Sequence, residues 1–183
     1  IVEEVLESME PADAREMREL LAYTPDTAGG IMTPDAITVG PQLTAEQAVS
    51  ALRSLSDQEH RVEYFYVTEP GSRRLVGVVS PRDLVMATPS ARVGDLMVRD
   101  VIKVLAEADQ EEAARLLDQH GLRAIPVVDD EERLLGVITE DDASYVLLEE
   151  AGEDIERLGG SQPLEEPYLR TSVIRLFRNR VIW

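Results

Sequence analysis

The stretch that decides the fold is Leu75-Val76-Gly77-Val78-Val79-Ser80-Pro81-Arg82-Asp83, and it recurs as Leu134-Leu135-Gly136-Val137-Ile138-Thr139-Glu140-Asp141-Asp142. In each copy, a short apolar run ends in a hydroxyl residue that is followed three positions later by an aspartate. An apolar run of this length predicts a buried strand. A serine or threonine directly after it predicts the N-cap of a helix. Each copy therefore predicts a strand that leads straight into a helix.

A second apolar run precedes each of these strands. The first is Tyr64–Val67 and the second is 124–128. The connections, 69–72 and 129–132, are polar and carry turn residues. Both copies therefore predict a hairpin before the helix.

The similarity continues toward the N-terminus of each copy. Residues 31–39 align with 96–104, and a helix start follows both. In the first copy Thr44-Ala45-Glu46-Gln47 is a capping box, and in the second Asp109 is the expected cap. The order β-α-β-β-α therefore occurs twice, which predicts an α/β fold. Since neither copy alone buries both faces of its short sheet, we expect the two to pack with pseudo-twofold symmetry and with clefts between them.

Composition excludes several classes of site. The 183 residues include no cysteine and two histidines, so a disulfide framework, a thiolate metal site or an all-histidine zinc site is not expected. The net charge of -18 argues against a nucleic acid partner and favours cations or basic partners, although general solubility also accounts for it. No catalytic constellation is recognisable. Met32, Met86 and Met97 are expected in the core rather than as cofactor ligands.

The two ends of the chain have distinct patterns. Residues 2–22 predict helix, interrupted at Pro11, and 149–154 form a strongly acidic helical segment. Residues 167–183 carry arginines without acids and have an apolar side. This pattern is typical of a helix at a membrane surface or just before a transmembrane span. A solvated helix that packs on the acidic body is the alternative. We expect the chain to be part of a longer protein.

The repeated residues resemble a pair of CBS motifs, named after cystathionine β-synthase. The flanking segments, 23–33 and 149–155, are similar to the MgtE family of magnesium transporters. The resemblance implies a homodimeric Mg²⁺ channel or transporter in the cell membrane, with this chain at its cytoplasmic face and its transmembrane domain outside the chain. The divisions expected on this basis are as follows: the end of an N-terminal helical domain at 1–24, CBS motifs at 25–90 and 91–148, an acidic helix end and linker at 149–166, and a basic amphipathic connecting helix at 167–183.

The acidic segment is the first candidate site. Glu150 and Asp154 are four residues apart, and so are Glu149 and Glu153, which places like charges on one helix face. A divalent cation would offset that repulsion, and Mg²⁺ prefers oxygen ligands. A solvated acidic helix is the alternative. The resemblance to MgtE implies these Mg²⁺ ligands: Asp109, Glu111, Asp118 through its backbone carbonyl, Asp142, Glu150, Glu153 and Asp154. Gly121 and Tyr145 stand where relatives carry aspartate, so we expect a site there to be weaker or lost.

The second candidate is a nucleotide cleft. The resemblance to CBS pairs implies that Asp83 or Asp142 accepts hydrogen bonds from ribose and that Arg82 meets phosphate. It further implies that Tyr64 and Leu122 sandwich the adenine of ATP or another adenine nucleotide. Ser80 and Thr139 acting only as helix caps is the alternative.

Two functions are consistent with these patterns, and neither is enzymatic. The preferred one is a cytosolic Mg²⁺-sensing module that gates a magnesium transporter, with Mg²⁺ favouring a compact, closed state. The alternative is an adenine-nucleotide-sensing CBS module of another protein.

Overall fold

The computed structural model describes residues 21–55 and 62–148. The chain divides into two units, 1–143 and 144–183, and each is considered by itself. In the second unit the described residues, 144–148, are helical. All the strands named below belong to the first unit.

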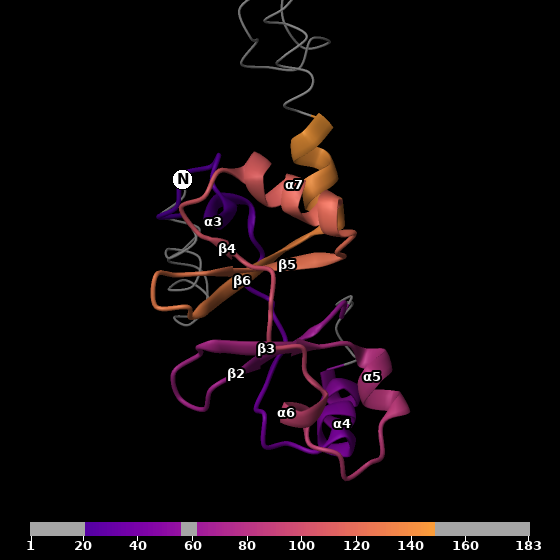
Figure 1. Ribbon diagram of the computed structural model, residues 1–183. Coiled ribbons are helices and arrows are strands. Elements are labelled where there is room, and N and C mark those ends of the chain that lie inside the picture. Colours follow the sequence, from indigo (N-terminus) through magenta and orange to yellow (C-terminus); the bar gives the residue numbers. More distant parts are fainter. Residues whose placement is uncertain (1–20, 56–61, 149–183) are drawn as a thin grey trace, which may run out of the picture. The chain divides into compact units, whose positions relative to one another are not determined.

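Two copies of one unit of secondary structure follow each other along the chain (Figure 1). The helices are α3 (Ala28–Ile31), α4 (Ala45–Leu55), α5 (Pro81–Met86), α6 (Val93–Leu96) and α7 (Gln110–His120), and the chain is helical again from 140. The strands are β1 (Thr38–Val39), β2 (Phe65–Thr68), β3 (Leu75–Val79), β4 (Val104–Leu105), β5 (Ala124–Val128) and β6 (Leu134–Thr139).

The strands form two sheets of the same topology, ordered β1-β2-β3 and β4-β5-β6. In each sheet the first two strands are parallel, connected through α4 or α7, and the last two form an antiparallel hairpin. The hairpin register shifts at the same place in both copies, between Val67 and Thr68 and between Val127 and Val128. The predicted α/β fold with two β-α-β-β-α repeats is confirmed.

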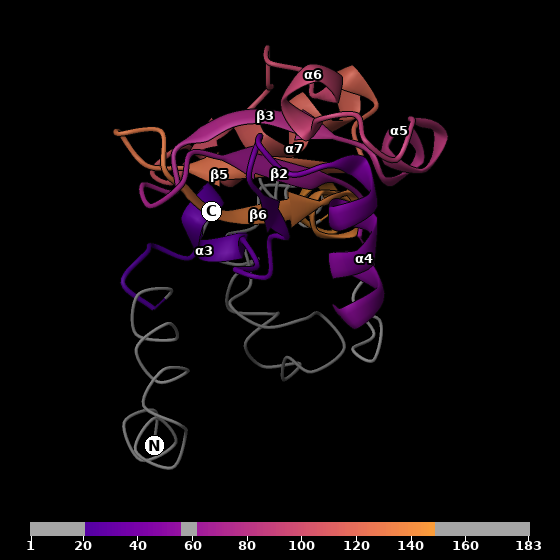
Figure 2. The same cartoon turned by 90° about the horizontal axis from the view of Figure 1, so that it is seen from below.

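The sheets face each other, and the helices cover their outer sides (Figure 1). Between the sheets lies a core cluster that both copies supply: Tyr66, Leu75, Val128, Leu134 and Val137. On the other side of the first sheet, Phe65, Val67 and Leu84 belong to a second cluster. Figure 2 shows α4 and α5 side by side over this region.

The segments before each sheet exchange partners. Thr33 precedes the first sheet, yet it pairs with Val137 in β6 through two backbone hydrogen bonds of 2.8 Å. Val98 precedes the second sheet and pairs in the same way with Val78 in β3, at 2.8 and 2.9 Å. Each copy thus completes the sheet of the other, which gives the expected pseudo-twofold arrangement.

Local signals in the sequence set the helix starts. Thr44 and Gln47 form the expected capping box, with N···O distances of 2.9 and 3.3 Å. Asp109 caps α7 by accepting the Glu111 backbone N–H at 2.8 Å.

Three expectations need correction. Strand β2 begins at Phe65 rather than Tyr64. Residues 21 and 22 form a turn, whereas the remainder of the helix expected at 2–22 lies outside the described residues. Met32 is buried in the core as expected. Met86, in contrast, is 78% exposed, because it is the last residue of the short helix α5, in which Leu84 is the buried residue.

Candidate ligand-binding site

Each β-strand to helix junction is closed by a hydroxyl and an aspartate. Ser80 Oγ donates to Asp83 Oδ2 at 2.6 Å and accepts the Asp83 N–H at 3.1 Å. Thr139 Oγ1 donates to Asp142 Oδ2, also at 2.6 Å, and its backbone N–H donates to the same oxygen at 3.0 Å. Both residues are therefore genuine helix caps. A carboxylate has about four acceptor positions, so each aspartate keeps capacity for a ligand.

A cavity of about 280 Å³, called the larger cavity below, lies between the two copies. Both copies contribute residues to its lining. The lining residues are Tyr64, Tyr66, Val78, Val98, Asp100, Val101, Ile102, Leu122, Ala124 and Pro126. The walls are mainly apolar, with one carboxylate and two phenols. Sites for small molecules have this character and begin at roughly 300 Å³.

The structure brings together two of the four residues expected to bind nucleotide. Tyr64 and Leu122 both line the larger cavity, from different copies. Arg82 and Asp83 are exposed on the first turn of α5 and do not line it. The geometry therefore provides an apolar pocket for a ring, whereas the polar contacts expected from α5 stay predictions.

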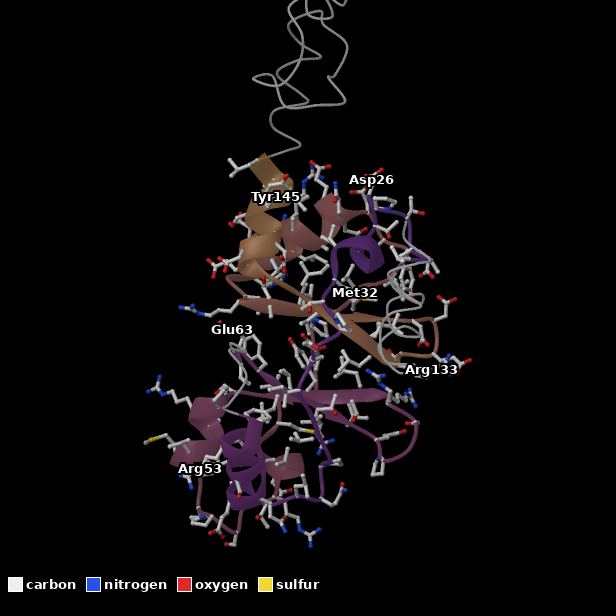
Figure 3. All side chains as sticks on the ribbon, turned by 180° about the vertical axis from the view of Figure 1, so that it is seen from behind. Asp26, Met32, Arg53, Glu63, Arg133 and Tyr145 are labelled. Atoms are coloured by element: carbon white, nitrogen blue, oxygen red, sulfur yellow. The ribbon has the colours of Figure 1, made fainter. Side chains whose placement is uncertain are left out.

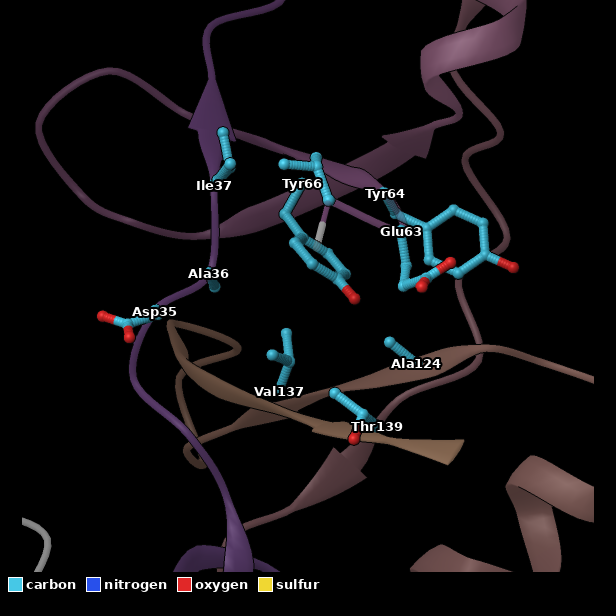
Figure 4. Close-up of a pocket in the computed structure, with 10 residues that line it drawn as sticks. Asp35, Ala36, Ile37, Glu63, Tyr64, Tyr66, Ala124, Val137 and Thr139 are labelled. Atoms are coloured by element: carbon cyan, nitrogen blue, oxygen red, sulfur yellow. The ribbon is translucent and has the colours of Figure 1, made fainter. Parts of the chain in front are cut away.

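A second cavity between the copies is much smaller, at about 30 Å³ (Figure 4). It will be called the smaller cavity. Its lining includes Asp35, Glu63, Tyr64, Tyr66 and Thr139. The hydroxyl of Tyr66 is directed into it, toward the region of Ala124, Val137 and Thr139.

Tyr66 carries the one buried side-chain polar atom without a hydrogen-bond partner in the part of the chain that the structure describes. Burial raises the pKa of its phenol, and the neighbouring Tyr64 and Glu63 raise it further. The side chain is therefore neutral, and its hydroxyl is free to act as donor or acceptor. Nothing in the sequence pattern singled it out.

The four described metal candidates are distributed over two helix starts and one helix end. Asp109 and Glu111 lie at the start of α7, where Glu111 forms an ion pair with Arg115 at 2.5 Å. Asp142 lies beside Thr139. Within residues 21–55 and 62–148, no three histidine, cysteine or acidic side chains are grouped to hold a metal. Glu150, Glu153 and Asp154 lie outside the described residues, so the complete set stays a prediction.

The backbone conformation at the end of α7 accounts for Gly121, which stands at a position where the resemblance to MgtE implied aspartate. Gly121 has φ 58°, the left-handed conformation that favours glycine, and its N–H donates to the Asp118 carbonyl at 3.2 Å. The Leu122 N–H donates to the Leu117 carbonyl at 3.0 Å. These two hydrogen bonds form a Schellman motif, and the backbone conformation that it needs at position 121 favours glycine. The Asp118 carbonyl retains a second lone pair for a metal.

Comparison with known proteins places this geometry in a family. The family model described as "CBS domain" matches residues 28–90 and 93–149. The chain belongs to the CBS domain family. The two matched segments correspond to the two copies that enclose both cavities.

Several relatives of this CBS pair are magnesium transporters. The magnesium transporter MgtE of Thermus thermophilus is 38% identical over 175 residues, 96% of this chain and 39% of that protein. A crystal structure of the cytosolic domain of the Mg²⁺ channel MgtE in complex with ATP has a TM-score of 0.75 at 37% identity, covering 79% of this chain and 58% of that one. The soluble part of a magnesium transporter gives 0.76 at 34% identity, covering 80% and 57%. The resemblance to the MgtE cytosolic region is therefore confirmed.

The chain spans 39% of the length of the Thermus relative. Among the helices in the described part of the chain, none is long and apolar enough to cross a membrane.

A cluster of charged side chains joins the hairpin ends of the two CBS motifs. The sequence pattern did not predict it. Glu132 forms ion pairs with Arg74 at 3.2 Å and with Lys103. Arg133 pairs with Asp129 at 2.7 Å, at the hairpin end labelled in Figure 3. Side-chain hydrogen bonds from Lys103 and then Arg74 lower the pKa of Glu132. We call Arg74, Lys103 and Glu132 the hairpin clasp.

Proposed function

We propose that this CBS pair is the cytosolic regulatory region of a magnesium transporter, which binds Mg²⁺ and an adenine nucleotide and so controls a pore. The similarity to MgtE over nearly the whole chain supports the magnesium part. The larger cavity between the motifs is the observation that supports the regulatory part, because it offers a small molecule room between the two copies. A role at the cytoplasmic face of the cell membrane, next to a transmembrane domain, follows from the same similarity.

The nucleotide is assigned to the larger cavity. Its apolar walls, with Tyr64 from the first copy and Leu122 from the second, suit the faces of an adenine ring, since aromatic and aliphatic side chains both pack on a base. The similar MgtE cytosolic domain was solved in complex with ATP. Asp83 retains acceptor positions for ribose hydroxyls, and Arg82, next to it, supplies the charge for phosphate.

Calorimetry with ATP tests this assignment. Replacing Arg82→Ala should weaken binding about tenfold or more, because a hydrogen bond to a charged group contributes about 1.5–3 kcal/mol. Arg92→Ala is the matched control, since Arg92 is also an exposed arginine but lies before α6, away in sequence from the Ser80–Asp83 junction. Equal affinities for the two variants would remove Arg82 from the site. Absence of ATP binding by the unaltered chain would remove the nucleotide from the proposal.

Mg²⁺ is assigned to the acidic residues. Asp109 and Glu111 offer oxygen ligands at the start of α7, and Asp142 offers another at the second junction. Glu150, Glu153 and Asp154 complete the proposed set. A ligand that binds only the folded state stabilises it, by about 2.7 kcal/mol at a hundredfold excess over its dissociation constant. The thermal midpoint should therefore rise more with MgCl₂ than with NaCl of equal ionic strength, and equal shifts would refute specific binding.

Gating requires that two arrangements bind Mg²⁺ with different affinity, because a ligand shifts an equilibrium only through such a difference. We propose that the Mg²⁺-bound arrangement is compact and closed, and that residues 167–183 carry the movement toward the membrane. Because the chain has no cysteine, a single label is placed by Arg175→Cys. The label-to-label distance within a homodimer should lengthen when Mg²⁺ is chelated. An unchanged distance distribution would refute the gating proposal even if Mg²⁺ binds.

The alternative, a nucleotide sensor of another protein, rests on the larger cavity alone. It predicts ATP binding without a specific Mg²⁺ effect. The two thermal and calorimetric experiments together separate the proposals.

A further inference from the structure

The two cavities occupy equivalent places in the repeat but differ about ninefold in volume, at about 280 and 30 Å³. Most of their lining residues correspond, although Tyr66 lines both cavities. Asp35, Ala36 and Ile37 line the smaller one, and Asp100, Val101 and Ile102, which occupy the same places in the second copy, line the larger. A ligand site that the internal symmetry predicts twice is therefore present at full size only once.

The equivalence of the strands identifies the residues that differ. Val39 in β1 pairs with Val67, and Val104 in β4 pairs with Val127. The residues one position earlier in β2 and β5 are Tyr66 and Pro126. Each also pairs across its hairpin, Tyr66 with Val78 and Pro126 with Val137. A tyrosine in one copy thus stands where the other copy has a proline.

The Tyr66 side chain is held where it is. Its backbone N–H donates to the Ile37 carbonyl at 2.9 Å, which fixes the strand. Its side chain belongs to the core cluster between the sheets and is 3% exposed. Its hydroxyl enters the smaller cavity (Figure 4). Because the ring is part of the packed core, moving it aside for a ligand would disrupt the contact between the two motifs.

We propose that Tyr66 restricts nucleotide binding to the larger cavity and leaves the smaller cavity for solvent. This inference rests on the proposed nucleotide function. A space of about 30 Å³ corresponds to the share of a single water in the liquid, whereas pockets for small molecules begin at roughly 300 Å³. A water there also gives the Tyr66 hydroxyl a partner, which no protein atom supplies.

The hydroxyl–aspartate pair of the smaller site is intact, although Asp141 stands where the first copy has Arg82, so this site lacks the cation proposed to meet phosphate. Thr139 and Asp142 form the same 2.6 Å hydrogen bond as Ser80 and Asp83. Removing the Tyr66 ring should therefore open a second site, weaker for ATP than the first because it has no arginine, and adding a ring at Pro126 should close the first.

The experiment is calorimetry of the full chain with ATP in metal-free buffer, with circular dichroism to confirm folding. At saturating ATP the unaltered chain should bind one ATP per chain and Tyr66→Val two, the second more weakly, while Tyr66→Phe, which keeps the ring, should bind one. Adding Asp142→Asn to Tyr66→Val should return the stoichiometry to one. Pro126→Tyr should remain folded and lose at least tenfold in affinity, and it provides the test if Tyr66→Val does not fold.

The outcomes separate this inference from the proposed function. Two ATP molecules on the unaltered chain, one on folded Tyr66→Val, or full affinity in Pro126→Tyr would each overturn the role of Tyr66. If the unaltered chain binds none, the nucleotide assignment fails. In that case a single ATP on Tyr66→Val that Asp142→Asn abolishes still supports the role of Tyr66, and no ATP on that variant refutes it.

Discussion

The backbone carbonyl of Thr33 lies so close to Gly136 that a Cβ at position 136 would meet it at 2.5 Å. Thr33 precedes the first sheet and Gly136 belongs to the last strand, so this approach fastens the beginning of the repeat region to its end. Ala28 and Gly29 in α3 add backbone hydrogen bonds to Ala108 and Ala106, both at 2.8 Å. The beginning of the first CBS motif is therefore attached to the second motif.

The equivalent glycine in the first motif has a softer neighbour, and this difference yields the first prediction. A Cβ at Gly77 would also come to 2.5 Å, but from the Sδ atom of Met97. A methionine side chain can move, whereas the Thr33 carbonyl is held by a paired backbone. Gly136→Ala should therefore lower the free energy of unfolding by about 1–3 kcal/mol, and Gly77→Ala by less.

Urea unfolding of the two variants measures the difference. Gly77→Ala is itself the matched control, because both variants add one methyl group in equivalent strands. Equal losses would mean that the backbone of residue 33 moves as easily as a methionine side chain, and would contradict the attachment described above.

The hairpin clasp gives the second prediction. Glu132 has its pKa lowered from the ordinary value of 4.5, chiefly by Lys103 and then by Arg74. Its ion pairs therefore contribute to stability above pH 4.5, and that contribution is lost as the pH falls through the lower pKa of the folded state. Glu132→Gln should lower the thermal midpoint at pH 7, and the difference from the unaltered chain should shrink below pH 4.5.

Thermal melting between pH 3 and pH 7 checks this, with Asp130→Asn in the same turn as control. The Glu132→Gln difference should also decrease in high salt, because these groups are partly exposed. A difference that stays constant down to pH 3 would show that the substitution acts through something other than charge.

Much of the fold was predictable because its signals are local. The capping box at Thr44 and the hydroxyl–aspartate junction at Ser80 each depend on residues within three positions, so sequence spacing alone specifies them. The partner exchange of Thr33 with Val137 was not predictable, because it depends on how two complete motifs pack. The same holds for the clasp, whose Lys103 and Glu132 are 29 residues apart.

The candidate site divides in the same way. Tyr64 and Leu122 were expected together on the basis of family resemblance, and both line the larger cavity. The role of Tyr66 was missed because an aromatic residue in a strand is the ordinary pattern of a core position. The unequal volumes of the two cavities and the unpartnered Tyr66 hydroxyl distinguish it from such a position.

The third prediction separates the two roles of Asp109. Its side chain caps α7, and we propose that it also binds Mg²⁺. Asparagine caps helices as well as aspartate does but has no charge. Asp109→Asn should therefore leave stability in chelator nearly unchanged and reduce the Mg²⁺-induced thermal shift. Asp109→Ala should reduce the shift and cost about 1 kcal/mol in chelator. A full Mg²⁺ shift in Asp109→Asn would exclude Asp109 as a ligand.

The fourth prediction concerns the proposed homodimer, for which the exposed face of α5 is a candidate interface. Val85 and Met86 are neighbours on this helix and are 67% and 78% exposed. Large apolar side chains that lie together on a surface are typical of a protein interface. A second copy of the chain is the expected partner, because a twofold axis brings the same patch of both copies together.

Met86→Glu should therefore dissociate the dimer, since two carboxylates would be buried opposite each other. The control is Leu105→Glu, which places the same charge at another exposed apolar residue, in β4 of the second motif. Sedimentation equilibrium at micromolar concentration, with and without Mg²⁺, measures the mass of each variant. The unaltered chain and Leu105→Glu should be dimers and Met86→Glu a monomer. A monomeric unaltered chain in both conditions would refute the dimer, and a dimeric Met86→Glu would move the interface away from α5.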